Sequence, residues 1–222
     1  MLWCLHGALG SFRDWDGLVD DEAHAVDLWQ TPQAGDMHHW ATEWTATVAK
    51  IDPTPILLGY SMGGRLALHA LLAAPTLWKK AIIISAHPGL HDESQRRRRQ
   101  ECDATWLTRF QTEPFQDVMC EWNTQPVFAN TSDKTPSAFK PGMARGFEDW
   151  SLGHQESLWD RLAEIRTPVL WLCGETDPKF GALGNEAVRR LPHGTYVEAP
   201  NCGHRVPWEW NDFPTFLTEI VS

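Results

Sequence analysis

Residues 55–66 read PILLGYSMGGRL, and this stretch decides the fold. The apolar run 55–58 is typical of a buried strand, and residues 63–75 have helical composition and spacing. Between them, residues 59–63 match the pattern G-x-S-x-G. A sharp turn from strand to helix needs these glycines, since a β-carbon would not fit beside the serine, and the turn lifts the hydroxyl clear of the backbone. We therefore expect a nucleophile turn that presents Ser61.

The same alternation of apolar runs and helical segments continues along the chain. Continuous short apolar runs suit strands that are buried on both faces of a parallel sheet. Such runs occupy residues 2–6, 24–29, 55–60, 81–85, 168–174 and 195–200, and helical segments occupy residues 37–51 and 63–75. The order predicts a doubly wound α/β domain with a mostly parallel sheet.

The alternation is interrupted between about residues 88 and 160. Apolar periodicity is weaker there, and charged, Trp-rich and Pro-bearing sequence dominates. We expect this segment to be a helical lid or cap inserted over the strand ends. The 222 residues then form one domain, in which residues 1–87 and 161–222 are the two parts of the core.

Composition excludes several classes of function. The formal net charge of -10 disfavours binding to nucleic acid, whose phosphates an acidic surface repels. The five cysteines are scattered and form no CxxC pair, so we expect no disulfide framework, no metal site and a reducing cytoplasm. No apolar run approaches the length that a membrane span needs, and no motif indicates a cofactor. The sequence does not indicate an oligomeric state.

Two further loops complete a candidate catalytic set. Asp177 follows the run 168–174, and His204 follows the run 195–200, so both lie where strands of an α/β fold end. The order Ser61, Asp177, His204 is the triad order of α/β hydrolases. His204 would accept the serine proton while Asp177 fixes its tautomer. Glu175 is an alternative for the acid.

The first strand is followed by a turn that could complete an oxyanion hole. Residues 6–10 read HGALG, and an HG turn after an early strand is where this fold supplies one backbone donor. The candidate donors are the backbone N–H groups of Ala8 and Met62. Taken alone, HGALG would more often be an ordinary loop.

Several motifs resemble those of a single family. They are LHGALGSFRDW at residues 5–15, GYSMGGRLAL at 59–68, HPGL at 87–90, the set Arg96, Arg99 and Asp103, WNTQPVFA at 122–129, SLGHQESLW at 151–159 and GETDPKF at 174–180. Together they resemble the 2-succinyl-6-hydroxy-2,4-cyclohexadiene-1-carboxylate synthases of menaquinone biosynthesis. The resemblance runs over most of the chain, although G-x-S-x-G and HG are common to the whole superfamily.

The resemblance implies a lyase that eliminates pyruvate from a succinylated, enolpyruvyl-bearing cyclohexene carboxylate. Ser61 would then act as a base, and the polycarboxylate substrate would need local cations. The cations that the resemblance implies are Arg65, Arg99 and Lys179, with Tyr60 and Trp122 shaping the pocket. Without the resemblance, Arg65 and Lys179 would be taken for exposed surface residues, and Trp122 for lid packing as readily as for a substrate contact.

The arginine run at residues 96–99 cannot act as one patch if the segment is helical, because successive side chains rotate by about 100°. Asp103 lies one turn beyond Arg99 and can orient it. Arg97 and Arg98 would point elsewhere, into solvent.

The chain also departs from the family pattern. A lid arginine of the family has no clear counterpart among Lys134, Lys140 and Arg145, and His91 stands where an amide is common. The N-terminal edge of the sheet is expected to be shortened.

Two other functions remain open from the sequence. A carboxylesterase or C–C bond hydrolase would use Ser61 as a true nucleophile, but it leaves the three cations unexplained. A non-catalytic α/β-hydrolase scaffold would have no physical need for an intact Ser, His and Asp set.

Overall fold

The computed structural model describes residues 1–30, 35–129, 131, 136 and 138–221. Within these residues, six strands form one sheet in the order β2-β1-β3-β4-β5-β6, and all neighbouring strands are parallel. The strands are β1 (Leu2–Leu5), β2 (His24–Val26), β3 (Ile56–Tyr60), β4 (Lys80–Ile84), β5 (Val169–Gly174) and β6 (Gly194–Ala199). The predicted parallel α/β sheet is confirmed.

One of the predicted runs is only partly a strand. The apolar run 24–29 contributes the short edge strand β2, which ends at Val26. Leu28 leaves the sheet because its backbone N–H donates to Nε2 of His6 instead of to a neighbouring strand. Trp29 likewise donates its indole N–H to the carbonyl oxygen of Gly10. These contacts tie the end of the run to the turn that follows β1.

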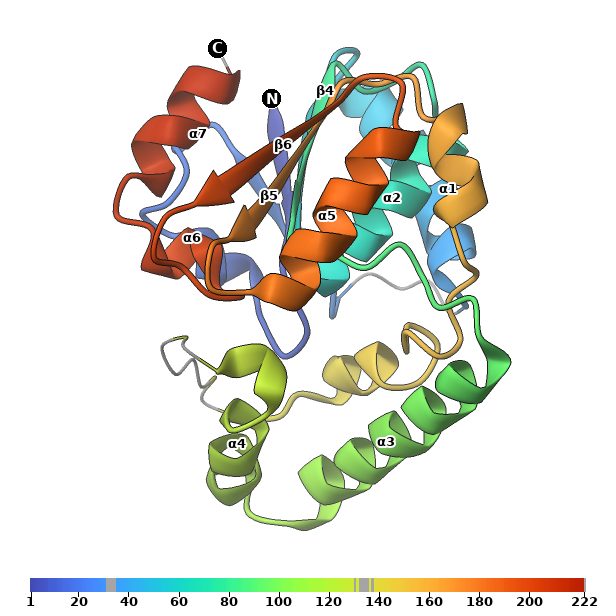
Figure 1. Cartoon of the computed structure of the whole chain (residues 1–222), viewed down its shortest axis with the longest axis vertical. Helices are drawn as coiled ribbons and strands as arrows, with labels where there is room; N and C mark the ends of the chain where they lie inside the picture. Colours follow the sequence, from blue (N-terminus) through green and yellow to red (C-terminus); the bar gives the residue numbers. More distant parts are fainter. Residues whose placement is uncertain (31–34, 130, 132–135, 137, 222) are drawn as a thin grey trace.

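The two faces of the sheet are covered by different helices (Figure 1). Side chains alternate along each strand, so that Leu57 belongs to one apolar cluster and Leu58 to the other. The first face is covered by α1 (Met37–Ile51), α2 (Met62–Ala73) and α5 (Pro178–Arg190), and the second by α6 (Val206–Glu209), α7 (Phe213–Val221) and the 3₁₀ turn η1 (Phe12–Trp15). Both faces are therefore buried, as the continuous apolar strands predict.

The predicted helices are present close to their expected ends. Helix α1 has the bounds 37–51 that the spacing predicts, and the carboxylate of Asp36 caps it by accepting from the backbone N–H of His39. Helix α2 begins at Met62, one residue before the predicted start, and ends at Ala73. Ser61 is therefore the last residue before a helix.

A helical segment between β4 and β5 lies across the carboxyl ends of the strands (Figure 1). It contains α3 (Glu93–Thr112), α4 (Phe115–Asn123) and the 3₁₀ helices η2 (Pro126–Phe128) and η3 (Pro141–Gly146), and η4 (Trp159–Glu164) leads back into the sheet. We refer to residues 88–160 as the cap segment. Its interior is aromatic, with Trp122 packed edge-on against Trp106 and Phe147.

The topology places a crevice above β1 and β3. From β1 the chain passes to β2 on one side, and then crosses to β3 on the other side and continues outward to β6. Ligands of open α/β sheets bind beyond the strand ends at this reversal. The turn of residues 6–10 follows β1, and Ser61 follows β3, so both flank the crevice.

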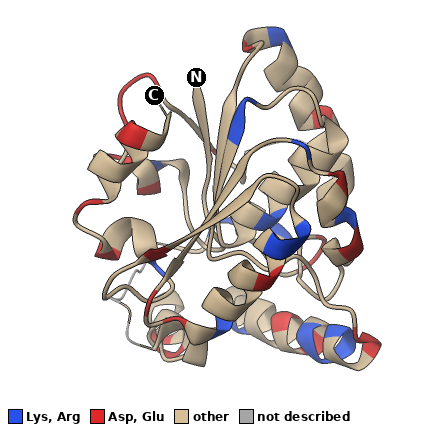
Figure 2. Ribbon diagram, turned by 45° about the horizontal axis from the view of Figure 1, so that its top comes forward, with Lys and Arg blue, Asp and Glu red and all other residues tan. Residues whose placement is uncertain are grey.

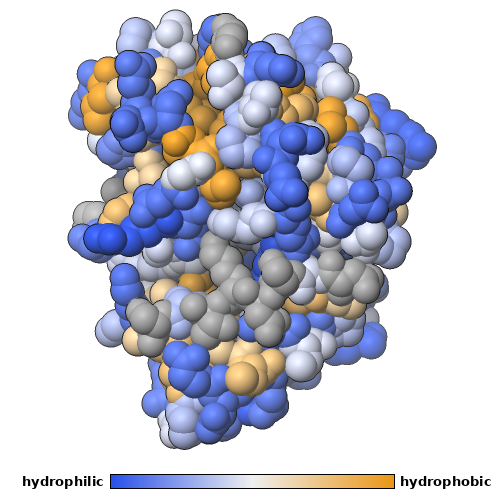
Figure 3. Space-filling view, turned by 90° about the vertical axis from the view of Figure 1, so that its left-hand side faces the viewer, coloured by the Kyte–Doolittle hydropathy of each residue, from blue (hydrophilic) through white to orange (hydrophobic). Residues whose placement is uncertain are grey.

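The exterior offers little continuous apolar surface on the side of α4, α6 and α7. There, the residues drawn in colour form small apolar groups among hydrophilic ones (Figure 3). Among the described large apolar side chains, Met1 and Ile51 are the exposed ones. No described helix is both long enough and apolar enough to cross a bilayer. The five cysteines are all free thiols.

Candidate active site

Ser61 occupies a strained turn between β3 and α2. Its backbone has φ 53° and ψ −110°, a conformation that costs energy for a residue with a side chain. The turn packs tightly on β1, because a β-carbon on Gly63 would lie 2.2 Å from the carbonyl oxygen of Leu5. The N–H of Ser61 donates to the carbonyl oxygen of Ile84 at 2.8 Å, which fixes the turn to β4. The serine side chain is thereby held over the crevice.

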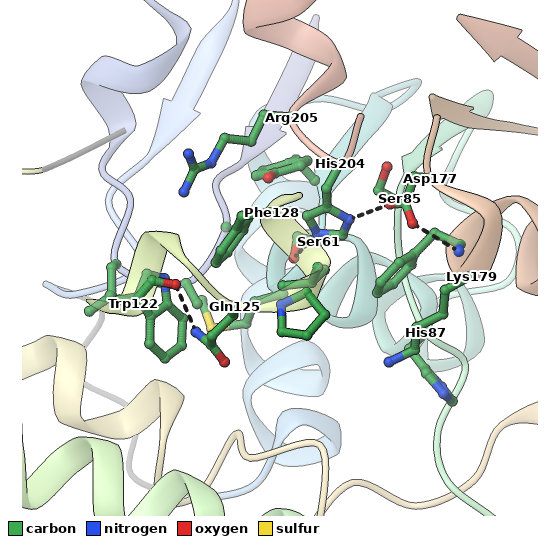
Figure 4. A pocket seen from close by; sticks show the side chains of 18 of the residues that line it. Ser61, Ser85, His87, Trp122, Gln125, Phe128, Asp177, Lys179, His204 and Arg205 are labelled. Atoms are coloured by element: carbon green, nitrogen blue, oxygen red, sulfur yellow. Dashed lines mark hydrogen bonds and ion pairs between the residues drawn. The ribbon is translucent and has the colours of Figure 1, made fainter. Parts of the chain in front are cut away.

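Ser61, His204 and Asp177 are brought into one hydrogen-bonded chain (Figure 4). His204 Nδ1 lies 2.8 Å from Asp177 Oδ2, and His204 Nε2 lies 3.2 Å from Ser61 Oγ. His204 and Asp177 are buried, with 3% and 7% of their surfaces exposed. Since the carboxylate accepts from the Nδ1 proton, Nε2 is left to accept from the serine hydroxyl. The geometry is that of a serine activated by a histidine base.

The neighbouring acid is turned away from the histidine. Glu175 is exposed and accepts from the backbone N–H of Asn201 at 2.8 Å. Asp177 is instead the N-cap of α5, where its Oδ1 accepts from the backbone N–H of Phe180. Of the two candidate acids, Asp177 is the one that the structure places against His204.

Two residues that line the same cavity as Ser61 have backbone N–H groups without an acceptor among the described residues. Met62 begins α2, where helical N–H groups have no intrahelical partner, and Ala8 lies in the turn that the Gly10 N–H closes onto the carbonyl oxygen of Gly7. Both residues line the cavity, and neither backbone N–H has a hydrogen-bond partner among the described residues. They can therefore donate to an oxygen bound beside Ser61.

The cavity has a volume of about 660 Å³ and lies between the sheet and the cap segment. Its wall includes four basic side chains, Arg65, Arg99, Lys179 and Arg205. The wall also includes the carboxylates of Asp14, Asp103 and Asp177, so basic side chains outnumber acidic ones in the cavity although the protein as a whole carries a net charge of -10. A cavity of this size and charge suits a small polyanionic molecule.

Arg65 is buried rather than exposed, with 6% of its surface accessible. Nη1 donates to Gln155 Oε1 at 3.0 Å, and Nη2 donates to the carbonyl oxygen of Trp150 at 2.7 Å. Burial, together with the nearby charge of Arg99, lowers its pKa to about 9. The side chain stays charged at neutral pH, and it links α2 to the cap segment as well as facing the cavity.

Arg99 lies in α3 and is oriented by Asp103, as the four-residue spacing predicts. Its Nε donates to both carboxylate oxygens of Asp103 at 2.9 Å, and Asp103 also accepts from the hydroxyl of Ser151 at 2.7 Å. The two terminal nitrogens of Arg99 have no partner among the described residues. Arg99 can therefore donate both to a ligand.

The other arginines of the run point away from this cavity. Arg97 and Arg98 are exposed, and Figure 2 shows basic and acidic residues interleaved along α3. Arg96 donates to the carbonyl oxygen of Gly153 and lines a separate, smaller cavity. Of the four, Arg99 is the one that lines the cavity beside Ser61.

Lys179 lies at the start of α5, close to both Asp177 and Arg99. Partial burial and the charge of Arg99 lower its pKa, and Asp177 partly opposes this. Its Nζ lies 5.5 Å from the centre of the Phe180 ring, which itself packs 4.4 Å from the ring of His204. Lys179 is therefore a cation on the Asp177 side of the serine.

Tyr60 and Trp122 form parts of the wall that differ in character. Tyr60 is buried beside His204 and packs edge-on against Trp208, and burial raises its pKa. Trp122 belongs to the aromatic interior of the cap segment and also lines the cavity. Trp122 therefore both packs the interior of the cap segment and forms part of the cavity wall.

Further polar residues of the wall, among them Ser85, His87 and Arg205, were not predicted from the sequence. His87 accepts from the N–H of Gly89 through Nδ1 at 3.0 Å, and burial plus the charges of Lys179 and other cations lower its pKa to about 3. Ser85 is buried and its hydroxyl has no partner among the described residues. Arg205 directly follows His204. His87 stands in the quoted HPGL motif, which was the available signal for it.

The described basic residues of the lid interval, Lys140 and Arg145, do not replace the lid arginine of the family. Lys140 and Arg145 do not line the cavity, and Arg145 lies over the ring of Trp150. Lys134 lies outside the described residues. His91 pairs with the hydroxyl of Ser157.

Comparison with known proteins shows the family to which the chain belongs. Residues 4–218 match the model of the alpha/beta hydrolase family. The 2-succinyl-6-hydroxy-2,4-cyclohexadiene-1-carboxylate synthase of Serratia proteamaculans is 34% identical over 90% of this chain and 88% of its own length. The chain belongs to this family of synthases. The synthase of Photorhabdus laumondii is also 34% identical, over 92% of this chain and 80% of its own.

Solved structures confirm the α/β-hydrolase fold of this chain. MenH from S. aureus superposes with a TM-score of 0.87 at 22% identity, covering 99% of this chain and 92% of that one. A thermophilic esterase from Thermogutta terrifontis superposes with a TM-score of 0.77 at 18% identity, covering 99% and 88%. At these identities the structures show the fold alone, and the fold is shared by proteins named for different reactions.

Proposed function

We propose that this chain eliminates pyruvate from 2-succinyl-5-enolpyruvyl-6-hydroxy-3-cyclohexene-1-carboxylate to give 2-succinyl-6-hydroxy-2,4-cyclohexadiene-1-carboxylate, a step of menaquinone biosynthesis. The observation that carries the proposal is the combination of a hydrogen-bonded serine and histidine with a cavity whose wall carries four cationic side chains. An acyl-transfer enzyme needs the first feature, but it has no need of the second. An enzyme that removes a proton from a substrate with three carboxylates needs both features.

In this reaction Ser61 acts as the base. His204 accepts the serine proton through Nε2, and Asp177 stabilises the resulting imidazolium. The serine oxygen takes the proton from the ring carbon that bears the succinyl group. The electron pair passes through the ring double bond, and the carbon–oxygen bond to the enolpyruvyl group breaks. Enolpyruvate leaves and becomes pyruvate.

Negative charge develops on the succinyl carbonyl oxygen during proton removal. The N–H groups of Ala8 and Met62 stabilise this oxygen, because both residues line the cavity beside Ser61 and neither N–H has another acceptor among the described residues. Arg65, Arg99 and Lys179 hold substrate carboxylates, and Tyr60 and Trp122 shape the wall around the ring. The cap segment acts as a lid that keeps water from the intermediate.

The substrate is a small molecule, and the proposal requires no metal, cofactor or nucleic acid. We place the reaction in the cytoplasm, because five free thiols, three of them buried, are compatible with a reducing compartment.

The test is to supply the enolpyruvyl precursor, generated in situ, and to follow pyruvate release. p-Nitrophenyl acetate serves as a parallel substrate for hydrolysis. Ser61→Ala should lower pyruvate release by about 10²–10⁴-fold, the usual contribution of a positioned base. Ser94→Ala, which removes an exposed hydroxyl at the start of α3, is the matched control and should be unchanged.

Two results would contradict the proposal. Rapid ester hydrolysis by the wild type without pyruvate release would assign a hydrolase with Ser61 as nucleophile. Full pyruvate release by Ser61→Ala would remove the serine from the mechanism.

A further inference from the structure

His87 lies just beyond the carboxyl end of β4, in the wall of the cavity. Strand β4 pairs with β5, and the backbone N–H of Ser85 continues this pairing by donating to the carbonyl oxygen of Leu172 at 2.9 Å. On the other side, the carbonyl oxygen of Pro88 accepts from the N–H of Leu158 in the cap segment at 2.8 Å. The short segment that carries His87 is therefore fixed both to the core and to the cap.

The turn that follows His87 determines which ring nitrogen carries the proton. The backbone N–H of Gly89 donates to Nδ1 at 3.0 Å. Because an N–H can only donate, Nδ1 is the acceptor, and the proton of the neutral ring is on Nε2. Gly89 has φ 119°, and a β-carbon there would lie 2.7 Å from the carbonyl oxygen of Glu156, so only glycine fits this turn. The tautomer of His87 is thus set by the backbone.

The Nε2–H group of His87 is a donor that no described residue uses. Nδ1 makes the one hydrogen bond recorded for the ring within the described residues, and Nε2 is not one of the unpartnered atoms closed off from solvent. His87 is 8% exposed and lines the cavity, so this small exposed part of the ring is reached from the cavity. A ligand that displaces water from such a donor must supply an acceptor, because a buried donor without one is costly.

Lys179 lies near this donor, on the same side of the catalytic residues. It is in the first turn of α5, which follows β5, the strand paired with β4. Figure 4 shows Lys179 and His87 together on one side of Ser61 and His204. Burial and then the charge of Lys179 lower the pKa of His87, so the ring stays neutral. A neutral donor in this place adds a directed hydrogen bond to an anion without adding another like charge.

We propose that His87 is a further substrate-binding residue, whose neutral imidazole donates a hydrogen bond from Nε2 to the substrate carboxylate that Lys179 binds. This inference rests on the proposed function, in which Lys179 holds one of three carboxylates. Lys179 supplies charge at the end of a flexible chain, whereas the direction of the His87 donor is fixed by the Gly89 turn. His87 therefore contributes specificity for the position of that carboxylate.

Two replacements of His87 separate substrate binding from support of the turn. His87→Asn keeps an acceptor for the Gly89 N–H, because the amide oxygen can take the place of Nδ1, but it is too short to present a donor at the place of Nε2. His87→Gln does the reverse, since its amide nitrogen reaches the place of Nε2. His39→Asn, which changes an exposed histidine of α1 outside the cavity, is the control. Thermal unfolding of each variant shows whether it is folded.

The first readout is kcat/KM for pyruvate release. His87→Asn should lower it by about 10- to 150-fold, the usual effect of one charge-assisted hydrogen bond, and His87→Gln should lower it less. His39→Asn should behave as the wild type. In the Lys179→Met background, the further loss caused by His87→Asn should be smaller than in the wild type, because the two contacts share one carboxylate.

The second readout is the affinity for 2-succinylbenzoate, a keto-diacid that has the ketone and both carboxylates of the proposed product. A loss of affinity in His87→Asn that parallels the loss in kcat/KM would assign the shared carboxylate to the ring or the succinyl chain. Unchanged affinity beside a lowered kcat/KM would assign it to the enolpyruvyl group. Either result supports His87 as a donor to the substrate.

Three results would overturn the inference. The first is a folded His87→Asn variant with the kcat/KM of the wild type. The second is a greater loss in His87→Gln than in His87→Asn, which would leave His87 as a support of the Gly89 turn. The third is a full, independent loss from His87→Asn in the Lys179→Met background, which would place the two side chains on different groups.

Failure of the proposed function is recognised separately. It fails if the wild type releases no pyruvate, and the affinities for 2-succinylbenzoate then test the donor alone. Weaker binding by His87→Asn than by His87→Gln and the wild type would retain His87 as part of a carboxylate subsite. Equal affinities, or no binding by the wild type, would overturn the inference as well.

Discussion

The replacement Arg99→Ala tests the cation group most directly, because its effects on binding and on folding can be separated. The terminal nitrogens of Arg99 are unoccupied among the described residues, so the replacement removes contacts that only a ligand would make. One charge-assisted hydrogen bond to a carboxylate contributes about 1.5–3 kcal/mol. We expect kcat/KM for pyruvate release to fall by about 10- to 150-fold.

The same replacement also leaves Asp103 without its counter-charge. Asp103 is 2% exposed, and the hydroxyl of Ser151 would be its remaining described partner. Removing one partner of a fully buried pair costs about 3–5 kcal/mol. The side chain of Arg99 is 38% exposed, so water screens the pair, and we expect a smaller loss of about 1–2 kcal/mol in the free energy of unfolding.

The double variant Arg99→Ala with Asp103→Asn separates the two effects. It removes the unpaired carboxylate, so urea unfolding should show most of the stability restored. Pyruvate release should stay low, because the cation is still absent. Arg98→Ala, in the same helix and outside the cavity, should change neither quantity. Recovery of kcat/KM in the double variant would refute the reasoning, since Arg99 would then act only by supporting the fold.

Two pH dependences follow from the shifted groups. Burial lowers the pKa of His69 to about 3, so the unfolded chain takes up this proton first as the pH falls. Urea unfolding should therefore show the free energy of unfolding decreasing below about pH 6.5, by about 2 kcal/mol for this residue between pH 7 and 5. In His69→Gln, the decrease over the same pH range should be smaller by about that amount. An identical pH profile for the variant and the wild type would contradict this. Lys179 has a lowered pKa, so KM should rise at alkaline pH as its charge is lost, and Lys179→Arg should move that rise to higher pH. An alkaline limb that does not move would remove Lys179 from carboxylate binding.

The features that the sequence predicted well depend on local spacing. The bounds of α1 follow from helical periodicity, and the pairing of Arg99 with Asp103 follows from a separation of one helical turn. The meeting of Ser61, Asp177 and His204 follows from three loops at the carboxyl edge of one parallel sheet. In each case the spacing in the sequence determines how the groups are arranged, because few residues separate them or because the topology of the sheet is fixed.

The features that the sequence could not predict depend on contacts between distant segments. Arg65 is buried because it reaches Trp150 and Gln155, which are 85 and 90 residues away. Nothing in the stretch around it distinguishes it from an exposed helix residue. Arg205 likewise depends on Phe128 and Asn123 of the cap segment. Composition and periodicity carry no information on such pairings.

These distant contacts give the cavity cations a second role. Arg65 extends from α2 to two acceptors of the cap segment, and Arg205 extends from the loop after β6 to Asn123 and Phe128. Within the cap segment, Asp103 orients Arg99 and holds Ser151 as well. The charges of Arg65 and Arg99 repel one another, and of the cavity cations Arg65 and Arg205 are held by contacts that also connect the cap to the core. These two side chains therefore contribute both to the position of the cap and to the charge of the site, so a variant that removes either of them changes both.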